Sequence, residues 1–212
     1  MNRPPILVPF GPPGAGKGSL AELLVARGFT ALSTGQALRT WAAGPRPEQR
    51  ALAATLAAGH YASDAQVTAI VMEFLETANP GGLIIDGFPR NLAQFETLRA
   101  RNLRIRAVLI RTDPAKLAAR LALRASCPAC GISRPAPAGT PCPACATPMR
   151  VRADDHDPAA IASRLEHYRA EVEPVLAAWQ AAGLPFLTIT NDGSRAALAL
   201  RADVVAAFAR AA

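Results

Sequence analysis

The segment 11–19, with the sequence GPPGAGKGS, has the residue types and spacing of a loop that binds phosphate groups. Because glycine has no Cβ, such a loop can bring backbone N–H groups close to a phosphate and adopt the positive φ angles this requires. Lys17 would reach the outer phosphates of a nucleoside triphosphate. The common pattern GxxxxGK[ST] has its hydroxyl directly after the lysine, whereas here Gly18 precedes Ser19. The predicted phosphate-binding residues are Gly14, Ala15, Gly16, Lys17, Gly18 and Ser19.

The elements on either side of this loop favour a phosphate site over a chance glycine-rich turn. The apolar run 6–10 predicts a buried strand that leads into the loop, and Leu20, Leu23 and Leu24 have helical spacing. A helix that begins at about Lys17 would direct the positive end of its dipole toward the phosphate. The chain is therefore predicted to bind a nucleotide phosphate.

Two further segments carry polar residues at positions suited to a ligand. The sequence DGFPR follows another apolar run and begins with Asp86, which would hold Mg²⁺ through water at the end of a parallel strand. The sequence LSTGQALR predicts a helix start, with Ser33 or Thr34 as its N-cap and Arg39 on the first turns. Taken singly, an ordinary turn and a solvated arginine explain these residues equally well.

Short apolar runs alternate with helical patterns along most of the chain. The alternation predicts an α/β fold, in which a parallel sheet has helices on both faces and binds ligands at the carboxyl ends of its strands. The predicted strands are residues 5–10, about 29–32, 82–86, 106–111 and 185–190. The predicted helices are residues 17–27, 35–43, 47–58, 64–78, 91–101, 114–124, 158–182 and 194–211.

All four cysteines lie in the segment 126–149, which is rich in Pro, Gly and Ala and has no helical periodicity. Four thiolates in two CxxC pairs can bind one Zn²⁺ tetrahedrally, and the metal would supply the folding energy that so short a segment lacks. Such a site is structural, because four protein ligands leave no open coordination position. The alternative is a pair of disulfides or a redox CxxC motif. The candidate ligands are Cys127, Cys130, Cys142 and Cys145.

Length and composition restrict the remaining possibilities. The 212 residues suit one α/β domain with insertions. The net charge of +7 and pI near 10 raise the question of nucleic-acid binding, but the arginines are spread singly, without a basic run or interleaved aromatic residues. We see neither an apolar stretch long enough to span a membrane nor room for a signal peptide before the first predicted strand. We therefore expect a cytoplasmic protein that binds neither nucleic acid nor a membrane.

In order along the chain, GPPGAGKGS, LSTGQALR, LIIDGFPRNLAQ, the two CPAC pairs and RVRADD…SRLEHY resemble the adenylate kinases whose lid contains zinc. The resemblance extends from about residue 5 to residue 190, and the DGFPR block is typical of nucleoside monophosphate kinases. It implies a P-loop NTPase-type five-stranded parallel sheet with helices on both faces, a helical arm that binds the nucleoside monophosphate (NMP), and a zinc-stapled lid. The implied divisions are a core of residues 1–32, 63–124 and 154–212, an NMP arm of residues 33–62 and a lid of residues 125–153.

The resemblance also implies an activity. This is the reversible, Mg²⁺-dependent transfer of the γ-phosphoryl group of ATP to AMP, which gives two ADP, by a monomeric enzyme of adenine nucleotide homeostasis with a structural Zn²⁺. The loose transition state of phosphoryl transfer would leave the protein mainly positioning and charge neutralisation to provide, and lid closure would exclude water. Two alternatives stay open: a kinase for another monophosphate such as UMP or CMP, and a zinc-ribbon nucleic-acid-binding protein with a relic P-loop.

Site residues follow from the same resemblance, position by position. Those implied in catalysis are Lys17, Asp86, Arg90, Arg124, Arg152 and Arg164. ATP would contact the phosphate loop and also Arg120, against its adenine, and Arg124, at its phosphates. AMP would contact Thr34, Arg39, Gly87, Arg90, Gln94, Arg152 and Arg164. Asp154 and Asp155 would pair with arginines as the lid closes, although the spacing from Asp155 to Arg164 is one residue longer than usual.

Within the AMP set, each residue has an implied partner. Arg39 and Arg90 would hold the phosphate of AMP, and Gln94 would read the edge of its adenine with Thr34 nearby. Gln36 departs from the pattern, because the related enzymes usually have an aspartate at that position. The departure removes a carboxylate from the NMP arm.

Overall fold

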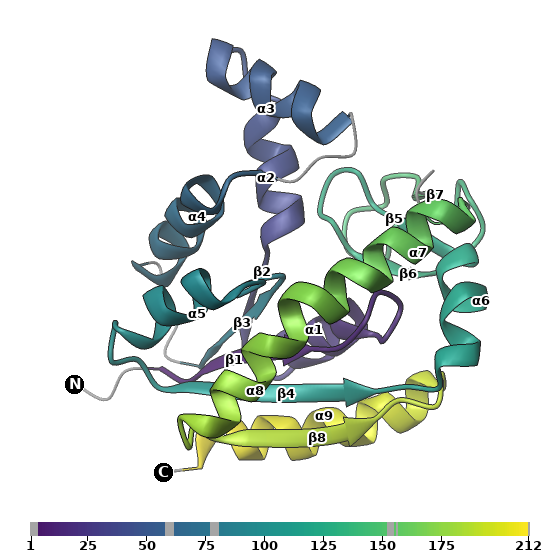
Figure 1. Cartoon of the computed structure of the whole chain (residues 1–212). Helices are drawn as coiled ribbons and strands as arrows, with labels where there is room; N and C mark the ends of the chain where they lie inside the picture. Colours follow the sequence, from purple (N-terminus) through teal and green to yellow (C-terminus); the bar gives the residue numbers. More distant parts are fainter. Residues whose placement is uncertain (1–3, 58–61, 77–80, 152–154, 156, 212) are drawn as a thin grey trace.

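The computed structural model describes residues 4–57, 62–76, 81–151, 155 and 157–211. Five parallel strands form its central sheet in the order β2-β3-β1-β4-β8 (Figure 1). These are β1 (Ile6–Phe10), β2 (Thr30–Ser33), β3 (Leu83–Asp86), β4 (Ile105–Arg111) and β8 (Phe186–Thr190). Each lies within one residue of its predicted bounds, so the predicted parallel sheet is confirmed.

The topology brings the loops with candidate site residues to one edge of the sheet. The strand β1 is central. In sequence order, β2 and β3 form one side of the sheet and the later strands β4 and β8 form the other. Ser33 pairs in register with Asp86, and Arg111 pairs with Thr190, so the strand ends are aligned. A ligand binds at this edge in open α/β sheets, where the connections leave β1 in opposite directions.

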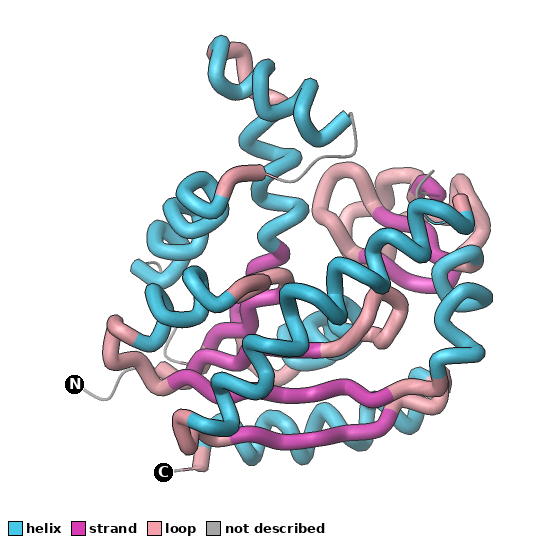
Figure 2. Tube along the Cα trace, in the orientation of Figure 1, coloured by secondary structure: helices cyan, strands magenta, loops and turns pink. Residues whose placement is uncertain are grey.

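Helices cover both faces of the sheet, as the sequence predicts (Figures 1 and 2). Several begin at a polar cap, such as Ser33 before α2 and Asn91 before α5, whose side chains accept hydrogen bonds from backbone N–H groups of the first turn. The helices are α1 (Lys17–Val25), α2 (Thr34–Ala42), α3 (Pro47–Ala57), α4 (Asp64–Glu76), α5 (Leu92–Arg99), α6 (Leu117–Ala122), α7 (Pro158–His167), α8 (Glu173–Ala181) and α9 (Arg195–Arg210), with a short 3₁₀ turn η1 (Pro114–Lys116).

The side chains of the sheet alternate between two hydrophobic cores. In β1, Ile6 and Val8 pack with residues of α5 and α8 on one face, whereas Leu7 packs with residues of α1 and α9 on the other. All three are at most 2% exposed. Burial on both faces explains why β1, β3 and β4 have continuous apolar sequences, and these central strands form the base that holds the loops at the carboxyl edge.

The segment predicted as an irregular module has a small sheet of its own. Its antiparallel strands are β5 (Arg124–Ser126), β6 (Ser133–Pro135) and β7 (Arg150–Val151), in the order β6-β5-β7. The prediction of a helix over 114–124 is wrong at its end, because α6 ends at Ala122 and residue 124 begins β5. Arg124 is therefore the first residue of the small lid sheet and not the last residue of the helix.

The predicted helix 158–182 is also interrupted. Between α7 and α8, the residues Tyr168–Val172 form a π-helical segment, η3, in which the N–H of Glu173 donates to the carbonyl of Tyr168. Pro174 follows immediately and has no N–H to give to a carbonyl one turn back, so the backbone adopts wider hydrogen bonding there. Over the described residues, we find no helix with the length and apolar character needed to cross a bilayer.

Candidate active site and metal centre

The loop between β1 and α1 has the backbone conformation expected of a phosphate cradle. Gly11, Gly14 and Gly16 have φ angles of 147°, 83° and 103°, as the sequence predicts for a loop of this type. A Cβ at Gly11 would lie 2.9 Å from the carbonyl oxygen of Ile110, so a side chain there would displace the neighbouring strand end. Helix α1 begins at Lys17, directly after the last of these glycines, which confirms the predicted helix start.

The ammonium group of Lys17 lies among the candidate catalytic residues. Its Nζ donates to the carbonyl oxygens of Gly11 at 2.7 Å and Pro12 at 3.2 Å. Burial lowers the pKa of Lys17 to about 8; Asp86 opposes this shift, and three cations, Arg90, Arg124 and Arg164, add to it. One carboxylate and three guanidinium groups therefore act on the charge of Lys17.

The strand end at Asp86 is joined to helix α2 by close backbone contacts. Thr34 is 1% exposed, and its Oγ1 donates to the carbonyl oxygen of Asp86 at 3.2 Å. Gly87 has a φ of 95°, and a Cβ there would collide with that same hydroxyl group. Arg90 then folds back, so that its Nε donates to the carbonyl oxygen of Gly87 at 2.9 Å. The DGFPR turn is thus packed against the start of the NMP arm.

Gln94 is fixed in its orientation by two partners. Its Oε1 accepts a hydrogen bond from the backbone N–H of Arg90 at 2.8 Å, so this atom must be the amide oxygen. Its Nε2 donates to Asp64 Oδ1 at 2.6 Å, and the side chain of Asn91 donates to both oxygens of the same carboxylate. The side chain of Gln94 is only 4% exposed, so these bonds determine how it faces the site.

The NMP arm and the lid touch near the cysteine pairs. Arg39 Nη2 donates to Gln36 Oε1 at 3.0 Å, and Gln36 Nε2 donates to the carbonyl oxygen of Pro128 in the lid at 3.4 Å. Gly131 lies against the same side chain, because a Cβ at Gly131 would be 2.5 Å from Gln36 Cγ. A groove beside this contact, in the NMP arm, is lined by Arg39, Ala42, Ala43, Ala53 and Leu56.

A buried carboxylate joins the lid to helix α7. Asp155 is fully buried and accepts hydrogen bonds from Arg124 Nε at 2.7 Å and Arg124 Nη2 at 2.5 Å. Arg164 Nη1 donates to the same carboxylate at 2.8 Å, so the longer spacing in the sequence does not keep it from this group. Arg152 and Asp154, which the sequence also assigns to the site, lie outside the described residues.

Arg120 lies beside the phosphate loop on its other flank. Its Nη1 donates to Thr112 Oγ1 at 2.7 Å, and its Nη2 would be 3.5 Å from a Cβ on Gly16. Helix α6 therefore places this guanidinium beside the phosphate loop, and its contact with the adenine of ATP stays a prediction.

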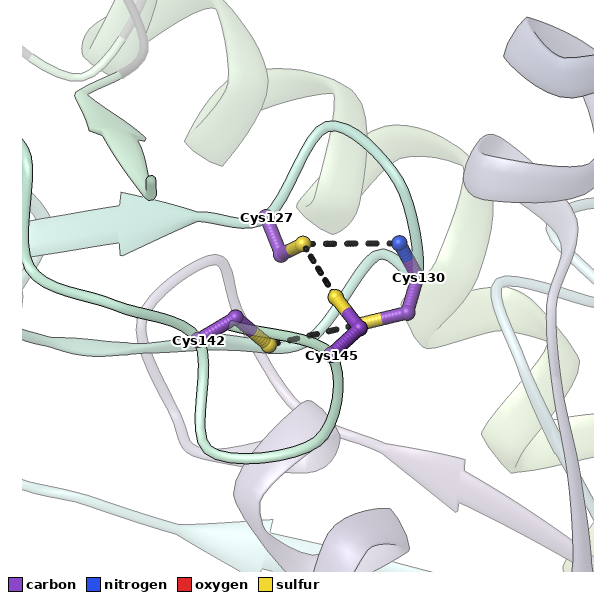
Figure 3. A group of neighbouring side chains, drawn as sticks. All are labelled: Cys127, Cys130, Cys142 and Cys145. Atoms are coloured by element: carbon purple, nitrogen blue, oxygen red, sulfur yellow. Dashed lines mark hydrogen bonds between the residues drawn. The ribbon is translucent and has the colours of Figure 1, made fainter. Parts of the chain in front are cut away.

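The four cysteine sulfurs converge between two loops of the lid (Figure 3). All four lie within 4.8 Å of one another, and the Sγ–Sγ distances are 3.4 Å for Cys127–Cys145, 3.4 Å for Cys130–Cys142 and 3.7 Å for Cys130–Cys145. Sulfurs at about 2.3 Å from one tetrahedral Zn²⁺ would be about 3.8 Å apart, whereas a disulfide needs about 2.05 Å. All four cysteines are free thiols, so the geometry fits a metal centre and not disulfide pairing.

Two of these thiols have shifted pKa values. Hydrogen bonds with the side chain and backbone of Thr147 lower the pKa of Cys145 to about 6, whereas burial is the main cause that raises the pKa of Cys130 to about 12. Four thiolates so close together repel one another unless a cation lies between them. A divalent metal would supply that cation.

Two residues of the site escaped the sequence analysis. Asp64 begins helix α4 and anchors Gln94, and Asn191 follows β8 and contacts the phosphate loop through its side chain. Both are polar residues at the ends of elements that reach the carboxyl edge of the sheet, which is the signal that could have identified them. Their partners are far away in the sequence, so spacing alone does not reveal the contacts.

Comparison with known proteins agrees with this geometry. The family model described as adenylate kinase matches residues 9–184. The adenylate kinase of Rhizobium rhizogenes is 37% identical over 191 residues, which cover 84% of this chain and 88% of the relative. That of Magnetococcus marinus is 36% identical over 191 residues, with 84% and 89% covered, and that of Xanthobacter autotrophicus is 37% identical over 184 residues, with 84% and 86% covered. With its phosphate loop, arginine cluster and four-cysteine lid, the chain belongs to the adenylate kinase family.

Proposed function

We propose that this chain transfers the γ-phosphoryl group of ATP to AMP through the residues gathered around Lys17, and that the reverse reaction uses two ADP. The observation that carries the proposal is the electrostatic surrounding of Lys17, where Asp86 and three arginines act on one ammonium group. A phosphoryl group in transfer carries negative charge on its oxygens, so Lys17 and the nearby arginines would stabilise it without proton transfer.

ATP is the donor in the phosphate loop. The N–H groups at the start of α1 and the ammonium of Lys17 would hold its β- and γ-phosphates, while Arg120 and Arg124 would lie along the same nucleotide. Lys17 would exchange its bonds to Gly11 and Pro12 for bonds to phosphate oxygens. Adenylate kinases use Mg²⁺ with ATP, and Asp86 is the carboxylate that we assign to the waters of that ion; the ion neutralises phosphate charge when bound.

AMP is the acceptor between α2 and the DGFPR turn, where Arg39 and Arg90 would hold its phosphate. Gln94 would read the base. Both its amide oxygen and its amide nitrogen can make a second hydrogen bond, so the oxygen could accept from the amino group of adenine while the nitrogen donates to the neighbouring ring nitrogen. Cytosine presents the same pair of groups, so CMP is a competitor that the NMP arm must exclude by size.

The lid would close over both nucleotides and exclude water from the transferred group. We assign Arg124 and Arg164, held by Asp155, to this closed state, together with Arg152. The four cysteines would hold a structural Zn²⁺ that keeps the lid folded. The divisions into core, NMP arm and lid, the monomeric state and the cytoplasmic location expected from the sequence stay predictions.

A turnover screen tests the proposal. We expect ADP formation from MgATP with AMP far above that with GMP, CMP or UMP, and ATP consumption that depends on the monophosphate. The variants Lys17→Met and Arg90→Ala should lower turnover by about 10³-fold or more with thermal unfolding little changed, because they remove charges that act on the transition state. Preference for CMP or UMP, or near-normal turnover in both variants, would contradict the assignment.

A further inference from the structure

The side chain of Asn191 connects the last strand of the sheet to the phosphate loop. It lies directly after β8 and is only 2% exposed. Its Nδ2 donates to the carbonyl oxygen of Ala15 at 2.7 Å, and its Oδ1 accepts from the N–H of Gly193 at 3.0 Å. A buried amide costs free energy unless both of its ends are bonded, so this side chain is held in one orientation.

The bond to Ala15 controls the direction of a backbone donor in the loop. The peptide bond between Ala15 and Gly16 is trans and planar, so its carbonyl and its N–H point in opposite directions. While the carbonyl is bonded to Asn191, the N–H of Gly16 is directed to the other side of the loop. Gly16 has a φ of 103°, and a Cβ there would collide with Asn191 Nδ2, so the amide fits only against a glycine.

The backbone of Asn191 extends the same connection to Arg120. Its N–H donates to the carbonyl oxygen of Arg111, which joins β8 to β4 at the carboxyl edge. Its carbonyl oxygen accepts from Thr112 Oγ1 at 2.9 Å, and that hydroxyl in turn accepts from Arg120. One residue therefore contacts the loop from behind and supports a guanidinium at its flank.

We propose that Asn191 is a positioning residue for ATP, which holds the Ala15–Gly16 peptide so that the Gly16 N–H faces the phosphates. The proposal rests on the proposed function, because it takes the loop to be the ATP site. Asn191 does not touch the nucleotide itself; its side chain acts through the loop. Its loss should therefore weaken the binding of ATP and leave the binding of AMP unchanged.

The variant Asn191→Asp tests this with almost no change of shape. A carboxylate can still accept from Gly193, but it cannot donate to Ala15, and it places a negative charge behind the phosphate loop. We expect the Kd for ATP, measured by calorimetry, to rise by about tenfold to a hundredfold, the range for a buried polar group that loses its partner. Asn191→Ala should raise it by about three- to tenfold, and the Kd for AMP should stay within about twofold in both variants.

Ser194→Ala is the matched control for stability. Ser194 lies three residues away and caps helix α9 by accepting from the N–H of Ala197, without a role in either nucleotide site. The variant Ser194→Ala should lower the melting temperature, and its affinities for ATP and AMP should be retained. Unchanged ATP affinity in both Asn191 variants, or an equal loss of ATP and AMP affinity, would overturn the proposal. Failure of the unmodified protein to bind ATP would instead overturn the proposed function.

Discussion

At the scale of single residues, the state of Lys17 differs from what a phosphate-bound lysine requires. It bonds to two carbonyl oxygens of its own loop, and its pKa is lowered to about 8 from the ordinary value of 10.5, chiefly by burial. Incoming phosphates must replace the carbonyls, and their negative charge favours the charged amine. ATP binding would therefore move the Lys17 amine from carbonyls of its own loop to the phosphates and raise its pKa.

This predicts a proton uptake on ATP binding. In the free protein, the Lys17 amine is charged below its pKa of about 8 and loses its charge above it. Bound phosphates raise that pKa, so ATP binding above about pH 8 takes up a proton, whereas binding at about pH 6.5 to 7 takes up much less. Calorimetry in buffers of different ionisation enthalpy measures the number of protons taken up on ATP binding. The variant Lys17→Met should abolish the difference in proton uptake between the two pH values. Equal uptake by both proteins would contradict the assignment.

A second residue-scale prediction concerns Asp64, which anchors the amide of Gln94. Asp64→Asn replaces a charged acceptor by an amide and should raise the KM for AMP about three- to tenfold, with the KM for ATP unchanged. Asp113→Asn is the matched control, because Asp113 caps η1 at an exposed position of another loop. If the two variants behave alike in AMP titrations, Asp64 has no part in AMP binding.

The sequence could reveal some of these residues and not others, for a physical reason. Lys17 and Asp86 lie in local patterns, a glycine-rich loop and a strand end, whose geometry follows from a few neighbouring residues. Asp64 acts on a residue 30 positions later, and Asn191 on one 176 positions earlier. Such contacts depend on how whole elements pack, which no short pattern contains.

At the scale of elements, burial decides which predictions are confirmed. The strands β1, β3 and β4 are buried on both faces, so their apolar runs mark them closely, whereas the edge strands β2 and β8 are partly exposed. The lid strands are only two or three residues long and polar, and they pair next to the cysteine loops without a large core. Their sequence therefore looks irregular. The π segment between α7 and α8 was also missed, because the pattern on either side of Pro174 is helical throughout.

For the lid, we predict that metal supplies its stability. Gently purified protein should contain about one zinc per chain, and chelation should lower the melting temperature; a loss of about 2 kcal/mol corresponds to about 4–8 °C in a chain of this size. Cys142→Ala should have the same effect without a chelator, and added Zn²⁺ should restore only the unmodified protein. Absence of metal together with four titratable thiols would contradict a metal-stabilised lid.

At the scale of the whole molecule, the NMP arm and the lid meet through Gln36, Pro128 and Gly131. Gln36 carries no charge, and its amide donates to a lid carbonyl. This contact joins the two parts that the proposed mechanism requires to close over separate nucleotides.

Gly131→Ala tests whether this contact matters for turnover. Gly131 has a φ of 76°, and its new Cβ would press on Gln36, so closure should be impeded and kcat/KM should fall by about three- to tenfold. Gly139→Ala is the matched control: Gly139 has a φ of 83° in the same lid, and a Cβ there meets nothing within 4 Å. Both variants should lose similar stability to backbone strain. Equal turnover in the two would show that the contact has no kinetic role.

The bond between Ala15 and Asn191 also has a consequence for the order of events on the ribosome. The phosphate loop emerges early in synthesis, but its anchor is 176 residues further along the chain and follows the strand at the edge of the sheet. The nucleotide site of the nascent protein is therefore complete only after β8 has emerged and paired with β4. A nascent chain stalled before residue 186 would carry the phosphate-loop motif and still bind ATP poorly.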